Sequence, residues 1–306
     1  MEVELQSQSP ILGFIGFGEA SYHLCKGLKS DGIQSIYSFD KMHDHNEIGP
    51  LLDKKSQEVG VKLVTSLEEL AQNSEIIFCA TSAKFAVAIA EEISPSLNQN
   101  HIYVDLNSAS PGVKRKISEI ITKANARFVD GAVMEPVPPN GHRVPIKLSG
   151  NGSKELNETM RKYGMVLDVV NELPGSASAF KMSRSIFVKG FTALLLETLQ
   201  ASHRFGIEEE ILESISTTLH SKPLNELADL LITRTAIHAE RRVTEMNEVI
   251  DTLNEIHVDP AMATQTKHVL QTIVDKDLKG YFENQVPPHY QDVVKALTII
   301  NQKGEK

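Results

Sequence analysis

The stretch Ile11–Ser21 reads ILGFIGFGEAS and predicts how the chain begins to fold. Its first five residues form a short apolar run typical of a buried strand, and Gly16, Gly18 and Ser21 follow in a Gly-x-Gly-x-x-Ser pattern. The first glycine permits a tight turn, the second lets a pyrophosphate approach the backbone, and the third position needs a small side chain. A helix expected over roughly residues 20–29 would direct its free amides at the anion. The stretch predicts a dinucleotide-binding turn; an ordinary strand-to-helix turn is the alternative.

An acidic residue follows this turn at the distance that such a cofactor needs. Asp40 comes directly after a second predicted strand, SIYSF, and lies 24 residues after Gly16. A carboxylate there accepts bonds from both ribose hydroxyls and repels a 2′-phosphate, which favours NAD over NADP. Lys41 and the histidines at 43 and 45 keep NADP open as an alternative. The candidate cofactor contacts in these two segments are Gly16, Phe17, Gly18, Glu19, Ala20, Asp40 and Lys41.

The first half of the chain alternates short apolar runs with helical patterns. The runs VKLVT, EIIFCA, HIYVDL, RFVDGAV, PIKLSG and MVLDVV continue the strand series, and the last ends at residue 170. Near-continuous apolar strands separated by helices predict a mainly parallel, doubly wound α/β sheet covered on both faces. From about Ser178 long helical periods replace the strand signals. We therefore expect a Rossmann-type domain over residues 1–174 and an all-helical domain over residues 175–306.

Composition narrows the class of protein. The chain has 306 residues, 41% of them hydrophobic and 23% charged, which suits two globular domains. The formal charge of −9 argues against a nucleic-acid partner, and no apolar run is long enough to span a bilayer. Cys25 and Cys79 fall in a predicted helix and strand, where buried thiols suit a reducing compartment. Without a signal-peptide pattern at the N-terminus, we expect a cytoplasmic protein that binds no membrane.

Polar residues follow the fourth and fifth predicted strands. Thr81 and Ser82 come after the fourth, and Asn107 and Ser108 after the fifth, at the edge of the sheet where ligands bind. We expect Thr81 and Ser82 to contact cofactor, and Asn107 and Ser108 to hold a substrate hydroxyl or the nicotinamide amide. The alternative for the last two is a plain turn, with Ser110 capping the next helix.

Three later stretches carry a family resemblance when taken with the glycine turn. VDLNSASP (Val104–Pro111), VDGAVMEPV (Val129–Val137) and GSASAFKMSRS (Gly175–Ser185) stand in the order of three motifs of one family. They resemble the Asp-x-Ser-Thr-x-x-Pro, Asp-Ala-Pro-Val-Ser-Gly-Gly and Gly-x-Gly-x-x-x-Lys-x-x-Asn-Asn segments of the β-hydroxyacid dehydrogenases, which include 3-hydroxyisobutyrate and 6-phosphogluconate dehydrogenases. Val133–Gly150 and His238–Leu253 look closer to one branch, described by its phosphogluconate-dehydrogenase-like C-terminal domain.

The resemblance implies an NAD(P)-dependent oxidoreductase acting on a small hydroxy acid, branched and phosphorylated acids included. It implies that Lys181 reaches into the cleft as general acid/base, because oxidising an alcohol requires removal of its hydroxyl proton. The small residues Ser176, Ala177 and Ser178 would let the substrate approach. A surface lysine on the first turn of a helix is the alternative for Lys181.

The sequence also departs from the family pattern. The two asparagines after the lysine are Arg184 and Ser185 here, and the Ser-Gly-Gly loop aligns with Met134, Glu135 and Pro136. Two glycines would have given that loop backbone freedom that these residues lack. Arg184 is one turn from Lys181 and is a candidate anchor for a substrate carboxylate or phosphate, with a solvated helix face as the alternative. Met134, Glu135 and Ser185 complete the substrate candidates of these segments.

The second half offers one candidate anion site. His238 and Arg242 are spaced to share a helix face with Glu245, with Arg241 on its flank. A salt-bridged exposed helix is the competing interpretation. In phosphogluconate dehydrogenases a partner subunit supplies basic residues there, so the resemblance implies a homodimer. No metal is expected, because His238 has no companion ligands at useful spacing. A non-catalytic NAD-binding sensor or scaffold and an imine reductase remain alternative functions.

Overall fold

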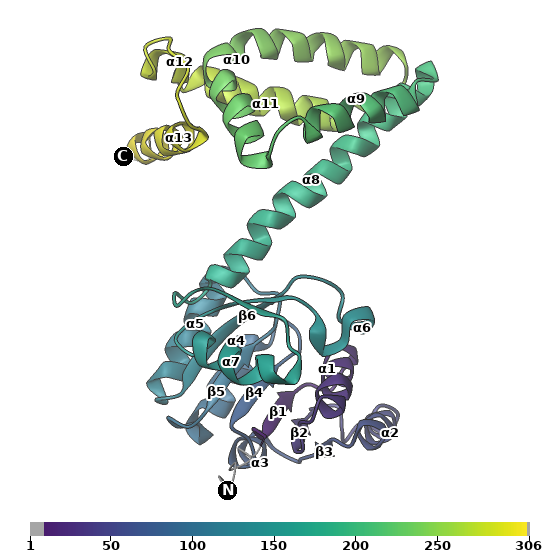
Figure 1. The fold of residues 1–306 in the computed structure, drawn as a ribbon, viewed down its shortest axis with the longest axis vertical. Coiled ribbons are helices and arrows are strands. Elements are labelled where there is room, and N and C mark those ends of the chain that lie inside the picture. The colour runs from purple at the N-terminus through teal and green to yellow at the C-terminus, as the bar shows by residue number, and fades with distance from the viewer. Residues whose placement is uncertain (1–8, 305–306) are drawn as a thin grey trace, which may run out of the picture. The chain divides into compact units, whose positions relative to one another are not determined.

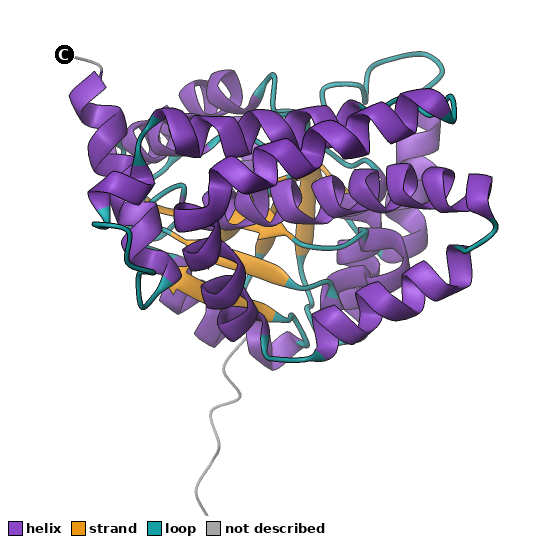
Figure 2. Cartoon of the chain, turned by 90° about the horizontal axis from the view of Figure 1, so that it is seen from above, coloured by secondary structure: helices purple, strands orange, loops and turns teal. Residues whose placement is uncertain are grey.

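The computed structural model describes residues 9–304 and divides into two compact units, Met1–Ser185 and Ile186–Lys306. The dividing point falls inside α8, Ser176–Phe205, which begins in the first unit and continues into the second (Figure 1). The boundary predicted from the sequence, between residues 174 and 175, lies just before this helix. The two compact units instead meet within the helix, between Ser185 and Ile186. All strands of the described chain lie in the first unit, where Figure 2 draws them in orange.

The first unit is built on one sheet whose strands run in the order β3-β2-β1-β4-β5-β6-β7-β8. Only the pairing of β6 with β7 is antiparallel among the described strands; the others are parallel. The expected mainly parallel sheet is therefore confirmed. The strands are β1 Leu12–Ile15, β2 Ile36–Phe39, β3 Lys62–Leu63, β4 Ile76–Cys79, β5 Ile102–Asp105, β6 Arg127–Val133, β7 Ile146–Ser149 and β8 Leu167–Asn171.

Helices cover both faces of this sheet, as the doubly wound pattern predicts. One apolar core places Leu24 of α1 and Leu156 of α7 against the strands, and the other places Leu70 of α3 and Ile117 of α5 against the opposite face. The helices of this unit are α1 Glu19–Ser30, α2 Gly49–Val59, α3 Leu67–Gln72, α4 Ala86–Ile93, α5 Pro111–Lys123, α6 Val137–Asn140 and α7 Ser153–Met160, with short 3₁₀ turns at Ser94–Ser96, Gly141–Arg143 and Arg161–Tyr163.

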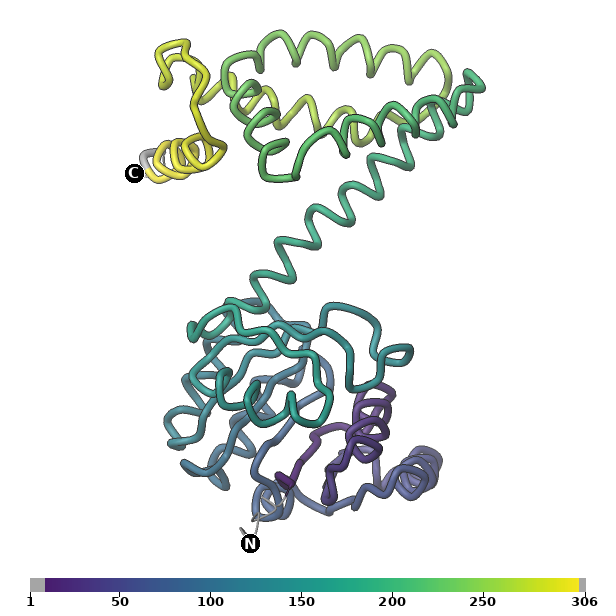
Figure 3. Tube along the Cα trace, viewed as in Figure 1, coloured from purple at the N-terminus to yellow at the C-terminus, as the bar shows by residue number. Residues whose placement is uncertain are grey.

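Helices are the secondary structure of the second unit over its described residues, which confirms the expected all-α region (Figure 3). It contains α9 Glu208–His220, α10 Leu224–Glu255, α11 Ala261–Asp275, α12 Leu278–Tyr281 and α13 Tyr290–Gly304. Its apolar side chains gather in two clusters, one around Ala236, Leu278 and Val293 and one around Leu253 and Val258. Every helix within residues 9–304 is too short or too polar to cross a membrane.

A fully buried ammonium group ties three elements of the first unit together. Lys114 of α5 places its Nζ 3.2 Å from Asp105 Oδ2 at the end of β5 and 3.2 Å from Asp130 Oδ1 in β6. The same Nζ donates to the Asp105 carbonyl oxygen at 2.7 Å. All three side chains are at most 1% exposed. Charges this deep in a protein are tolerated only when they are paired and hydrogen-bonded, and this lysine satisfies both conditions.

The same cluster begins helix α8. The first amides of a helix have no acceptor inside the helix, so other groups must accept from them. The Ala177 amide donates to Ser149 Oγ at 3.0 Å, and the Ser178 amide donates to Asp130 Oδ2 at 2.9 Å. The Ser178 hydroxyl donates to Asp130 Oδ1 at 2.7 Å. Residues of β6 and β7 thus cap α8 and fix its starting point on the sheet.

Replacing the buried lysine should be costly. Lys114→Met keeps most of the side-chain volume but leaves Asp105 and Asp130 as two buried carboxylates without their cation. We expect the free energy of unfolding to fall by about 3–5 kcal/mol, the range for removing one partner of a buried ion pair. Lys116→Met is the matched control, because Lys116 is an exposed lysine of the same helix, and it should change stability by less than about 0.5 kcal/mol. Urea denaturation of both variants measures the difference, and equal stabilities would show that the cluster contributes nothing.

Both cysteines are buried free thiols, as the sequence predicts. Burial, together with the neighbouring carboxylate of Asp105, raises the pKa of Cys79 from an ordinary 9.0 to about 11. Burial also raises the pKa of Cys25 well above its usual value. Neither group would form a thiolate at neutral pH while the protein is folded, so neither is a candidate nucleophile.

The Cys79 shift predicts a loss of stability in alkali. The folded protein holds this proton more tightly than the unfolded chain, so the stabilisation is complete below pH 9 and disappears as the pH rises to about 11. Between these limits the wild type should lose about 2–3 kcal/mol more unfolding free energy than Cys79→Ser, whose hydroxyl does not titrate. Denaturant titrations at several pH values test this, and parallel pH curves for the two proteins would contradict it.

Candidate active site

A cavity of about 360 Å³ opens in the first unit at the carboxyl ends of β4, β5 and β6. This is the edge at which open α/β sheets bind their ligands. The loops after these strands, the start of α1 and one residue of α8 line it. The lining residues are Ala20, Leu24, Ala80, Thr81, Ala83, Leu106, Asn107, Ser108, Val133, Glu135, Val137 and Lys181.

The glycine turn beside this cavity has the conformation that its sequence requires. Gly16 has a φ of +86°, and a Cβ there would lie 2.7 Å from both the Ala80 carbonyl oxygen and Thr81 Cγ2. Gly18 precedes α1, and a Cβ there would meet nothing within 4 Å. Gly16 is therefore required by the close approach of the backbone, while Gly18 leaves open space before the first amides of α1. This cradle fits a dinucleotide pyrophosphate, which the helix N-terminus would stabilise.

Asp40 is joined to the glycine turn by a hydrogen bond. Its Oδ2 accepts from the Phe17 amide at 2.7 Å, and its Oδ1 accepts from the Met42 amide at 2.8 Å. The carboxylate is partly exposed at the end of β2, beside the exposed Lys41. Asp40 therefore remains a candidate for contact with the ribose that would follow the pyrophosphate.

The other residues expected at the turn differ in what they present. The Phe17 side chain is completely buried in the apolar core, so only its backbone faces the turn. Glu19 is exposed, whereas Ala20 lines the cavity. Ser21, the third small residue of the pattern, is fully buried against the sheet, in agreement with its expected packing role.

Asn107 connects two loops of the cavity instead of standing free. It is 5% exposed, and its Oδ1 accepts from the Thr81 amide at 2.8 Å. Its Nδ2 donates to Asp105 Oδ1 at 2.6 Å. Thr81 and Ser82 are exposed at the end of β4. Asn107 therefore fixes the position of Thr81 through bonds that the sequence analysis did not predict. Ser110 caps α5 as expected, accepting from the Val113 amide.

Lys181 and Ser108 meet at the cavity. Lys181 Nζ donates to Ser108 Oγ at 3.2 Å, and both residues line the cavity together with Glu135. Lys181 is partly buried, which differs from the freely solvated lysine of the alternative interpretation. Arg184 and Ser185 follow on the same helix, and neither lines this cavity. The structure thus brings together two of the predicted substrate-site residues, Lys181 and Ser108, with Glu135 beside them.

The segment Met134–Pro136 lies beside the cavity without the positive φ angles that glycines would allow. The Met134 amide donates to the Pro145 carbonyl oxygen at 2.9 Å, which extends the pairing of β6 with β7. The Glu135 carboxylate accepts from Asn140 Nδ2 at 3.4 Å. The segment is therefore held by its own contacts, with Glu135 directed into the lining of the cavity.

The predicted basic face of the helical unit is interrupted. His238 has φ −112° and ψ 17°, so α10 is kinked there and the spacing expected of an unbroken helix does not apply across it. Arg241 pairs with Glu245 at 2.8 Å on the exposed surface, as the salt-bridge interpretation expects. Arg242 donates to the Thr235 hydroxyl. The expected shared face of His238 and Arg242 is therefore corrected: Arg242 is bonded to its own helix, and His238 is exposed at the kink.

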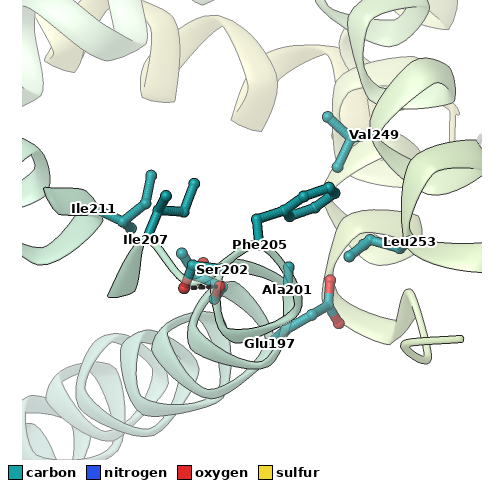
Figure 4. A pocket seen from close by; sticks show the side chains of 9 residues that line it. Glu197, Ala201, Ser202, Phe205, Ile207, Ile211, Val249 and Leu253 are labelled. Carbon is teal, nitrogen blue, oxygen red and sulfur yellow. Dashed lines mark hydrogen bonds between the residues drawn. The ribbon is translucent and has the colours of Figure 1, made fainter. Parts of the chain in front are cut away.

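The helical unit has a separate cavity of about 280 Å³ with mostly apolar walls (Figure 4). Phe205, Ile207 and Val249 contribute to its lining, and Glu197 is the charged residue at its margin. The Glu197 carboxylate accepts from the Met262 amide at 2.6 Å, next to the first turn of α11. No residue predicted from sequence lies there, and its one carboxylate serves as a helix cap.

Sequence reasoning missed the residues that support this site from within. Asp105, Lys114 and Asp130 were not among the candidates, although all are buried and bonded to one another. Ser178 was expected only as a small residue beside the substrate, whereas it is 4% exposed and bonded to Asp130. A signal was present, because each aspartate directly follows a valine in a predicted buried strand. A carboxylate in such a position requires a partner. The sequence could not show that one lysine of α5 serves both.

Comparison with protein families assigns both parts of the chain. Residues 11–134 match the NAD-binding domain of 6-phosphogluconate dehydrogenase. Residues 202–273 match a domain of unknown function, DUF1932. The first match contains Gly16, Gly18 and Asp40, so the turn described above belongs to an NAD-binding domain. The expected nicotinamide cofactor is thereby confirmed at the level of the domain.

Solved imine reductases share the fold. An imine reductase from Bacillus cereus superposes with a TM-score of 0.74 at 17% identity, covering 94% of this chain and 98% of the other. At this identity the likeness shows a common architecture.

Proteins of higher identity extend over most of the chain. A conserved hypothetical protein from Sinorhizobium meliloti is 30% identical and has a TM-score of 0.65, covering 98% of this chain and 99% of its own. A conserved protein described as structurally similar to 3-hydroxyacid dehydrogenases is 34% identical with a TM-score of 0.60, covering 88% and 98%. An uncharacterized 28.5 kDa protein from Methanothermus fervidus is 28% identical, covering 86% and 98%. The chain belongs to the 3-hydroxyacid dehydrogenase-like family, in the branch that combines a 6-phosphogluconate-dehydrogenase-type NAD-binding domain with DUF1932.

Proposed function

We propose that this protein transfers hydride between a nicotinamide cofactor and a small hydroxy acid, with Lys181 as general acid/base. The observation that carries the proposal is the pairing of Lys181 Nζ with Ser108 Oγ at 3.2 Å in a cavity next to the glycine turn. An amine and a hydroxyl at the edge of an NAD-binding sheet are the groups needed to hold an alcohol and remove its proton.

The chemistry assigns a distinct role to each group. A dinucleotide held by its pyrophosphate at the glycine turn would supply a nicotinamide as the acceptor of the hydride on the carbon that carries the substrate hydroxyl. The Ser108 hydroxyl orients the substrate oxygen, and neutral Lys181 accepts its proton as the carbonyl forms. The proton is later released to solvent, so that one alcohol and one oxidised cofactor give one carbonyl compound, one reduced cofactor and one proton. In the reductive direction, protonated Lys181 returns the proton to the carbonyl oxygen.

The anionic end of such a substrate requires a cation. Arg184 follows Lys181 by one helical turn and is exposed, so it is our first candidate for this anchor. Arg242 and His238 of the helical unit are the second candidate pair, and we place Met134, Glu135 and Ser185 beside the substrate. Like the family's homodimeric members, this protein would then use a second copy to complete the site.

Lys181 also distinguishes the proposed dehydrogenase from two alternative functions. An imine reductase of this fold would not need an amine to take up a hydroxyl proton, and a non-catalytic NAD-binding protein would need no proton acceptor. The pairing of Lys181 with Ser108 favours the dehydrogenase over both.

We expect NAD to bind more tightly than NADP because the Asp40 carboxylate meets the adenosine ribose. Asp40→Asn keeps an acceptor for the Phe17 amide but removes the charge that repels a 2′-phosphate. The ratio of NAD to NADP affinity should fall by roughly 10- to 100-fold, the equivalent of a hydrogen bond to a charged group. Asp44→Asn, at an exposed neighbouring carboxylate, is the control and should leave the ratio unchanged. Calorimetric titration measures both, and a wild type that prefers NADP would show that the role given to Asp40 is wrong.

Lys181→Ala should fold and bind NAD as the wild type does, because the glycine turn and Asp40 belong to the β1–α1–β2 segment, whereas Lys181 belongs to α8. Turnover should fall by about 10²–10⁴-fold, the usual contribution of a positioned proton-transfer group. The wild-type oxidation rate should rise with pH as the amine loses its proton, and the variant should not show this rise. Lys181→Arg should not restore activity, because a guanidinium does not release its proton.

The assay is a screen of hydroxy acids that follows the absorbance of reduced cofactor. Lys116→Ala, at an exposed lysine of α5, controls for the loss of a positive charge. Full turnover by Lys181→Ala on the best substrate would show that Lys181 has no catalytic role and is only a surface lysine at the start of a helix.

A further inference from the structure

Asp130 is a buried carboxylate whose two oxygens are both bonded to protein groups. It is 0% exposed. Its Oδ1 lies 3.2 Å from Lys114 Nζ and accepts from the Ser178 hydroxyl at 2.7 Å. Its Oδ2 accepts from the Ser178 amide at 2.9 Å and from Ser149 Oγ at 3.3 Å. A carboxylate so enclosed cannot touch a substrate, so any effect on catalysis must pass through the groups that it holds.

The charge of Asp130 suits the helix terminus that it caps. Lys114 is one cation shared by two carboxylates, so the cluster retains one negative charge after pairing. The first turn of α8, whose amides carry the positive end of the helix dipole, offsets the remaining charge. Asp130 therefore attracts this turn more strongly than a neutral cap would, and charge-assisted bonds of this kind are also better defined in geometry.

Lys181 and Ser108, the two residues of the proposed chemistry, each lie three residues after a member of this cluster. Ser178, which Asp130 holds by backbone and side chain, precedes Lys181 by three residues, or about one turn of α8. Asp105, which Lys114 holds by its carboxylate and its carbonyl oxygen, precedes Ser108 by three residues. One ammonium thus connects the chain segments that place Lys181 and Ser108 at 3.2 Å from each other.

We propose that Asp130 is a positioning residue for Lys181. It clamps the first turn of α8 to β6, and so sets the position of the Lys181 amine relative to Ser108 and the substrate oxygen. The inference rests on the proposed function, because it assigns Asp130 an effect on turnover through Lys181. Displacing a reacting group by about 1 Å is enough to slow a reaction about 100-fold.

The test is a double-mutant cycle on the full chain, measured as kcat with the best substrate of the hydroxy-acid screen. Asp130→Asn preserves shape and removes the charge. With Lys181 present, it should lower kcat by about 10- to 100-fold and leave NAD affinity within about two-fold. In the Lys181→Ala background it should cause no further loss, because residues that act as a unit are not additive.

Ser178→Ala is the second variant, because it removes only the hydroxyl bond to Asp130 and retains the amide bond. It should lower kcat by a smaller factor, again only when Lys181 is present. Should Asp130→Asn fail to fold, this variant decides the question alone. Ile93→Val is the control for instability. Ile93 is fully buried in α4 and makes no bond to the cluster, so its loss of a methyl group should lower stability and leave kcat unchanged.

The outcomes separate the two proposals. If the position-130 and position-178 variants lose the same factor with and without Lys181, or lose none while folded, Asp130 does not position the lysine. If Lys181→Ala itself retains full turnover, the proposed function fails and the positioning role fails with it. A loss of kcat that occurs only when Lys181 is present supports both the proposed function and the positioning role of Asp130.

Discussion

The bond network around the Lys114 ammonium is the constraint on which the first unit depends. Two strands that lie side by side in the sheet, β5 and β6, each bury an aspartate, and a buried carboxylate is costly without a partner. One lysine from α5 makes both possible. The energetic balance of such a cluster against an apolar core is often close to neutral. Its value here is directional, because each bond determines where a neighbouring segment begins.

Three segments take their position from that cluster. The loop after β5 is held through Asp105 and Asn107, and Asn107 in turn holds the Thr81 amide after β4. The start of α8 is held through Asp130. The cavity therefore has walls whose polar groups are already bonded to one another before a ligand enters. A site organised in this way loses little entropy when substrate binds, which favours catalysis that relies on geometry.

The cofactor side of the site follows a different principle. There the backbone forms the candidate binding surface. Gly16 adopts a positive φ that places it against Ala80, and Gly18 leaves room in front of the α1 amides. Asp40 supports this turn, because its carboxylate accepts from the Phe17 amide, and it is also the candidate for contact with the ribose. The two halves of the site thus use separate devices, and a variant in one need not disturb the other.

Most of the strand and helix order, the mainly parallel sheet and the NAD-binding turn could be predicted from the sequence, because each depends on local pattern. The proposed role of Lys181 came from a motif resemblance and stays a prediction. Apolar periodicity records which face of a strand is buried, and glycine spacing records a local backbone conformation. The sequence did not show that Lys114 pairs with Asp105 and Asp130, that Asn107 is bonded within the protein, or that α10 is kinked at His238. The bonds of Lys114 with Asp130 and of Asn107 with the Thr81 amide join residues that are distant in the chain. The kink at His238 has no local signal such as a proline or glycine beside it. Tertiary structure alone decides them, since a buried charge shows its partner only after the sheet has brought the two together.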